Sequence, residues 1–71
     1  MRYAVSYINL SDFDLTTEII KAPSDVEAIK LHSKVQEYEW INQDRSPCTT
    51  QQEMKYVAFD CDSMVNAVPI A

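Results

Sequence analysis

The stretch "KAPSDVEAIKLHSK", residues 21–34, marks the point where strand-like sequence gives way to a helix. Pro23 lacks a backbone N–H group, so it ends strand pairing. Ser24 suits the N-cap position, because its hydroxyl can accept a hydrogen bond from the amide of Glu27, whose carboxylate can reach back to the Ser24 amide. Apolar residues then recur at helical spacing. The sequence therefore predicts a helix over residues 24–42.

Two strand-like segments precede this helix. Residues 2–10 and 13–22 are rich in β-branched and aromatic residues, and each alternates between two sets of side chains, as strands do. The residues between them include Ser and Asp, which favour a turn. The two segments are therefore expected to form a β-hairpin.

The sequence after the helix predicts the rest of the sheet. Residues 43–53 are polar, contain a proline and read as a loop. Residues 54–61 alternate in a way that predicts a strand, and residues 63–71 are a candidate for a further short edge strand. The expected fold is α+β, with an antiparallel sheet of three to four strands in the order ββαβ or ββαββ, and with the helix on one face.

Length, charge and composition exclude several classes of protein. A chain of 71 residues allows one domain, spanning residues 1–71. The net charge of −5, with six scattered Lys and Arg residues, disfavours direct binding of nucleic acid. Uncharged runs reach only nine residues, too short to span a membrane, and two cysteines do not form a disulfide framework. We therefore expect a cytoplasmic protein with free thiols.

Residues that could carry chemistry are few. His32, Cys48 and Cys61 lack the spacing of a metal site, so no metal or other cofactor is expected. Asp60 and Asp62 would share one face of the predicted strand, where paired carboxylates can hold Mg²⁺ for hydrolysis. The chain contains no glycine, which excludes glycine-rich phosphate loops. A small Mg-dependent hydrolase is therefore only a further alternative, and the expected protein is not an enzyme.

Apolar residues outside the expected core predict an interface. The helix has a second apolar side that includes Trp40, and tryptophan commonly anchors interfaces. A single helix covers one face of a sheet, which leaves the other exposed. That face would carry Ala4, Ser6, Ile8, Ile20, Tyr56 and Ala58. We expect a protein partner or a two-fold homodimer, with the partner-binding residues Val26, Ile29, Trp40, Ile8 and Tyr56.

The acidic residues offer an alternative mode of binding. An acidic surface can imitate nucleic acid and occupy a DNA- or RNA-binding cleft, and such binding weakens steeply as salt rises. The residues that would form this surface are Asp12, Asp14, Glu18, Glu37, Glu39, Asp60 and Asp62.

The segment "EIIKAPSDVEAIKLH", residues 18–32, resembles a pattern found in small acidic proteins of phages and mobile elements, in which a hairpin leads into a helix. The matching residues are Ala22, Ser24, Glu27, Ala28 and Ile29. The resemblance implies a phage accessory or host-takeover factor that acts in the host cytoplasm. The leading hypothesis is a non-catalytic protein-binding module, which inhibits or regulates a host protein such as a defence enzyme, a toxin or a polymerase.

Overall fold

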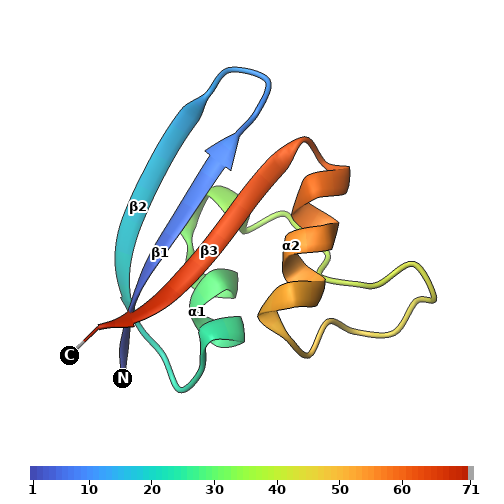
Figure 1. The fold of residues 1–71 in the computed structure, drawn as a ribbon. Coiled ribbons are helices and arrows are strands. Elements are labelled where there is room, and N and C mark those ends of the chain that lie inside the picture. Colours follow the sequence, from blue (N-terminus) through green and yellow to red (C-terminus); the bar gives the residue numbers. More distant parts are fainter. Residues whose placement is uncertain (71) are drawn as a thin grey trace.

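The computed structural model describes residues 1–70 and shows an α+β fold with a three-stranded antiparallel sheet and two α-helices (Figure 1). The predicted fold class is therefore confirmed. The elements are β1 (Arg2–Asn9), β2 (Asp14–Lys21), α1 (Asp25–Leu31), the 3₁₀-helix η1 (Ser33–Val35), α2 (Gln51–Asp60) and β3 (Ser63–Ile70).

The strands lie in the order β2-β1-β3, and both neighbouring pairs are antiparallel. Figure 1 shows α1 and α2 on the same side of the sheet. The side chains that β1 turns toward the helices, Tyr3, Val5 and Tyr7, are buried, as the alternation of residues 2–10 predicts. They pack in one cluster with Ile29 of α1 and Met54 of α2. All the covering elements therefore lie on one face, and the other face remains open.

The predicted helix over residues 24–42 begins correctly but ends early. Ser24 accepts a hydrogen bond from the Glu27 amide at 3.2 Å, while the Glu27 carboxylate pairs with Lys30 instead of reaching back. His32 stops the helix, because its backbone is extended (ψ 134°) and its ring accepts a hydrogen bond from the Lys34 amide. A buried polar side chain that caps a new turn thus overrides the apolar periodicity on which the longer helix was predicted.

The predicted loop over residues 43–53 is observed as far as Thr50, but the predicted strand over residues 54–61 was wrong, because α2 begins at Gln51 and occupies this region. Thr50 and Glu53 form a capping box: the Thr50 hydroxyl accepts from the Glu53 amide at 3.2 Å, and the Glu53 carboxylate accepts from the Thr50 amide at 3.1 Å. Met54 and Ala58, four residues apart, form the buried side of the helix. This capping signal is present in the sequence, but the strand prediction was based on the two-residue alternation of residues 54–61.

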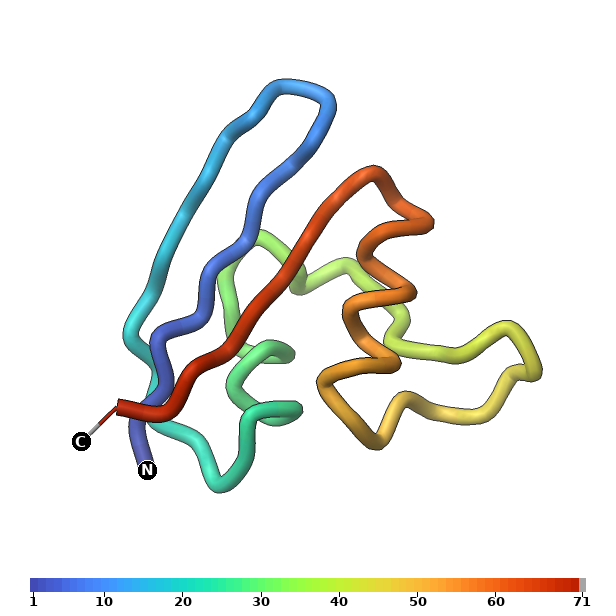
Figure 2. The backbone as a smooth tube through the Cα atoms, viewed as in Figure 1, coloured from blue at the N-terminus to red at the C-terminus, as the bar shows by residue number. Residues whose placement is uncertain are grey.

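The last strand completes the sheet. Residues 63–71 were only a candidate strand, and β3 now takes the third place in the sheet that was predicted for residues 54–61. Pro69 lies near its end, and Ala71 lies outside the described residues. Figure 2 shows that the start of β1 and the end of β3 lie at one end of the sheet, while the β1–β2 and α2–β3 turns lie at the other.

The capping box of α2 gives a testable stability effect. Thr50→Ala should lower the free energy of unfolding by about 1 kcal/mol, since it removes the acceptor for an otherwise unpaired amide. The measurement is the midpoint of urea unfolding, with Thr50→Ser as a control that keeps the acceptor and should stay close to the parent. Equal midpoints for Thr50→Ala and the parent would mean that the cap does not stabilise α2.

Candidate functional site

The patch predicted on the helix does not lie on the surface. Ile29 and Trp40 are buried in the core, and Val26 is partly buried against it. Trp40 packs on Tyr38, with ring centroids 5.0 Å apart. A chain of this size has few large side chains with which to form a core, so its tryptophan is used there. The prediction that these residues form an interface was therefore wrong.

The other two predicted partner-binding residues are closer to the surface but lie on different elements. Ile8 is half-buried on the face of the sheet that the helices leave uncovered. Tyr56 is exposed, but it belongs to α2 and not to a strand. Ile20 and Ala58, which were expected on the uncovered face, are buried in the core. One face of the sheet is open as predicted, although the residues that lie on it differ from those predicted.

We call this uncovered side of the sheet the open face. The strand register places its residues in rows: Ala4 beside Ile19 and Val68, Ser6 beside Thr17 and Asn66, and Ile8 beside Leu15 and Met64. Four large apolar side chains on it are about half exposed or more: Leu15 (62%), Ile19 (59%), Met64 (54%) and Val68 (48%). None of these four residues was predicted to belong to a site. The alternation of residues 13–22 grouped Leu15 with Ile19 but gave no sign of which face the helices would cover.

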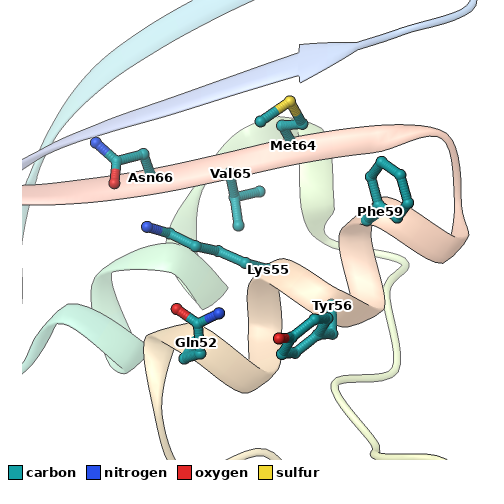
Figure 3. A pocket seen from close by; sticks show the side chains of 7 residues that line it. All are labelled: Gln52, Lys55, Tyr56, Phe59, Met64, Val65 and Asn66. Atoms are coloured by element: carbon teal, nitrogen blue, oxygen red, sulfur yellow. The ribbon is translucent and has the colours of Figure 1, made fainter.

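Two concave features adjoin the open face. A depression of about 130 Å³ lies on it and is lined by Ser6, Ile8, Leu15, Met64, Val65 and Asn66. A groove of about 360 Å³ lies between α2 and β3, lined by Gln52, Lys55, Tyr56, Phe59, Met64, Val65 and Asn66 (Figure 3). The two linings share three residues of β3.

Met64 joins these features into one surface. Its side chain contributes to the depression on the open face and also to the groove, where Figure 3 shows it above Phe59. Phe59 and Tyr56 are exposed on the groove side of α2. We call the combined region the apolar surface. Its exposed or half-buried members are Ile8, Leu15, Ile19, Tyr56, Phe59, Met64 and Val68.

Acidic residues gather at one end of the sheet. The Leu10 amide donates to the Asp62 carbonyl at 2.8 Å, which joins the β1–β2 turn to the α2–β3 turn. The exposed carboxylates on or beside these two turns are those of Asp12, Asp14, Asp60 and Asp62. At the opposite end, Arg2 and Lys21 face each other in the strand register. The sheet is therefore acidic at its turn end and carries two basic side chains at its other end (Figure 2).

The predicted magnesium pair does not have the predicted geometry. Asp60 is the last residue of α2, and Asp62 lies in the following turn with a positive φ of 55°. The two carboxylates therefore do not share the face of a strand. Within residues 1–70, no group of three or more His, Cys, Asp or Glu side chains is arranged to hold a metal ion.

The remaining acidic residues of the predicted surface are dispersed. Glu37 and Glu39 are exposed in the segment that follows η1. Glu18 lies on the helix side of β2, where its carboxylate accepts hydrogen bonds from the hydroxyl and the amide of Ser33. These bonds, together with the charge of the nearby Lys34, hold the pKa of Glu18 below its usual value. Glu18 is thus a structural link between β2 and η1.

This link predicts a loss of stability in acid. Because the pKa of Glu18 is lower in the folded state than in the unfolded chain, its contribution is present above the ordinary pKa of 4.5 and is lost as the pH falls through the folded value. Urea midpoints measured from pH 6 downward should fall less for Glu18→Gln than for the parent. Parallel pH profiles for the two proteins would contradict a stabilising Glu18–Ser33 link.

Of the remaining reactive side chains, His32 and Cys48 are buried and Cys61 is exposed. His32 is fully buried; its Nδ1 accepts from the Lys34 amide, so its Nε2 carries the proton and donates to the Thr16 carbonyl at 3.2 Å. Cys48 and Cys61 are both free thiols. Cys48 is the buried one, where burial raises its pKa and disfavours the reactive thiolate. Neither His32 nor Cys48 is placed to act on a substrate.

Comparison of the chain with models of protein families, with curated proteins and with solved structures finds no match. In the described part of the chain, no helix has the length and apolar character needed to cross a membrane. The functional assignment therefore depends on the geometry of the apolar surface.

Proposed function

We propose that this protein is a non-catalytic protein-binding module and that the apolar surface is its docking site. The observation that carries the proposal is the exposure of Leu15, Ile19, Met64 and Val68 on one open face, next to the groove of α2. Contiguous exposed apolar patches are uncommon on small monomeric proteins and mark sites of interaction. A partner that covers this face would complete the layer that the chain itself does not supply.

The charge distribution indicates the kind of partner. The turn end beside the open face carries the exposed Asp12, Asp14 and Asp62, so a partner with basic groups at the rim of its apolar patch fits best. An inhibitor or regulator of a host protein, acting in the host cytoplasm, is the biological role that agrees with the phage-like hairpin and helix. The target classes we favour are defence enzymes, toxins and polymerases.

Site-specific cross-linking tests this function. A photo-activated amino acid at position 64 should yield a covalent adduct with one defined protein in the cells that produce this chain. The matched control is position 31, since Leu31 is equally apolar and 55% exposed but lies on α1, away from the apolar surface. An adduct formed from position 31 and not from position 64 would place the docking site elsewhere.

Mimicry of nucleic acid is the alternative proposal, and it is supported by the four carboxylates at the turn end. The two modes differ in their dependence on salt. Binding through the apolar surface should survive an increase in salt, whereas a mimic that depends on exposed carboxylates should lose its partner. Washing the position-64 complex at increasing salt before illumination distinguishes them: retention of the adduct supports the apolar surface, and its loss supports mimicry.

A further inference from the structure

The two edges of the sheet differ in how they are protected. At the β3 edge, the side-chain amide of Gln51 donates to the Ala67 carbonyl at 3.2 Å and accepts from the Ala67 amide at 2.8 Å. Pro69 has no N–H group to offer. Val65, also on this edge, is only 4% exposed beneath the α2 groove. The β3 edge is therefore closed to a further strand.

The β2 edge has no such protection. In the strand register, Val5 of β1 lies between Ala67 of β3 and Glu18 of β2. The backbone N–H of Ala67 bonds to the side chain of Gln51 and therefore points away from β1. The backbone N–H and C=O groups of Val5 must then point toward Glu18. Residues at odd positions in β2 must then direct their N–H and C=O groups outward. They include Leu15, Thr17 and Ile19, all of them exposed. No hydrogen bond within residues 1–70 uses these outward groups.

We infer that a second copy of this chain pairs with the β2 edge in antiparallel orientation, joining the two sheets into one continuous sheet around a two-fold axis at Thr17. A two-fold pairing along one strand is self-complementary, which is the usual form of a homodimer interface. Strand β2 is eight residues long and contains no proline, so it can form a ladder with itself.

The side chains of β2 select this register. With Thr17 facing the second copy's Thr17, Leu15 faces the second copy's Ile19 on the open face, and the same pair repeats across the axis. Thr–Thr and apolar pairs are favourable in antiparallel ladders. A register centred on Glu18 would instead place two like charges directly opposite each other, which is destabilising. The observed sequence therefore favours one alignment.

The charges at the two ends of β2 agree with antiparallel pairing around Thr17. Asp14 begins the strand and Lys21 ends it, so antiparallel pairing brings the acidic turn end of each copy beside the basic end of the other. Glu18 is held by Ser33 in the helix layer, and its charge therefore does not block the edge. The two open faces lie on the same side of the joined sheet. Pairing at the edge brings Leu15 and Ile19 of the two copies together but leaves Met64, Val68 and the groove of α2 uncovered, so the inference does not depend on the proposed docking site.

A charge-swap experiment tests the edge dimer. Purified parent protein at micromolar concentration should have twice the 8.2 kDa chain mass by light scattering. Thr17→Lys and Thr17→Glu should each be monomeric, because two like charges meet at the axis, with dimerisation at least tenfold weaker. An equimolar mixture of the two variants should regain the dimer mass. The matched control is Asn66→Lys, which adds the same charge in the same row of the open face but on β3, and should remain dimeric.

Other results would overturn the inference. A parent that is monomeric throughout the micromolar range, or a dimer that survives Thr17→Lys, excludes pairing through β2. Dissociation by Asn66→Lys as well as Thr17→Lys would show that the open faces meet instead. Amide hydrogen exchange provides an independent readout. The outward backbone amide of residue 17 should be protected from exchange in the parent dimer, whereas the same amide should exchange rapidly in the folded Thr17→Lys monomer.

Discussion

Ile29→Ala is expected to remove a large part of the free energy that keeps the protein folded. Ile29 is completely buried in the core cluster. Truncation of such a side chain leaves a cavity and lowers the free energy of unfolding by about 2–5 kcal/mol. At about 0.05–0.15 kcal/mol per residue, a chain of 71 residues has a total stability of only roughly 4–11 kcal/mol.

Urea unfolding followed by circular dichroism measures this effect, and Leu31→Ala is the matched control. Leu31 lies on the same helix but is exposed, so its truncation should change the stability by less than about 0.5 kcal/mol. If Ile29→Ala and Leu31→Ala had similar midpoints, Ile29 would be a surface residue, as the sequence analysis first predicted, and the assignment of the core would be incorrect.

His32→Ala is expected to have the second large effect, about 3 kcal/mol or more. It leaves a cavity in the core and removes the ring that bonds to the Thr16 carbonyl and to the Lys34 amide. Each buried polar group that is left unpaired contributes roughly 1–3 kcal/mol to the loss. The start of η1 should loosen as well, because the ring caps it.

His32→Asn separates the contributions to this loss. A shorter amide side chain can still accept from the amide two residues later, as in an Asx turn, but does not reach Thr16. Its urea midpoint should therefore lie between those of the parent and His32→Ala. A His32→Ala variant as stable as the parent would show that the histidine is not a structural residue and would reopen the question of a chemical role.

The hairpin and the first helix were predictable because their signals are local. Alternation over residues 2–10 and 13–22, followed by Pro23 and the Ser24 cap, determines where strand ends and helix begins. The end of that helix depends on His32, whose ring finds a partner in β2, sixteen residues earlier in the chain. A contact between distant segments of this kind leaves no periodic signature in the sequence.

The error at residues 54–61 has a different origin. This segment alternates as a strand does, but it also places Met54 and Ala58 at helical spacing behind the Thr50–Glu53 capping box. A helical start signal should outweigh the alternation of a short segment. Because this segment was predicted as a strand, Phe59 and Tyr56 could not be predicted to line a groove beside a helix. The uncovered side of the sheet was predicted from the number of layers.

The site was only partly predictable for the same reason. Ile8 could be placed on the open face, because β1 alternates clearly between buried and exposed side chains. Met64 and Val68 could not, since the face of a strand is defined only when its neighbours and the covering helices are known. Trp40 was misassigned because an aromatic residue serves equally well in a core and at an interface.

Binding of the partner identified by cross-linking to two charged variants tests the docking site most directly. Met64→Asp places a charge where the open face meets the groove, whereas Leu31→Asp places the same charge on an equally exposed apolar residue elsewhere. We expect Met64→Asp to bind at least tenfold more weakly than the parent, about 1.4 kcal/mol, and Leu31→Asp to bind as the parent does. Parent-like affinity for Met64→Asp, with both variants folded, would contradict the assignment of the apolar surface as the docking site.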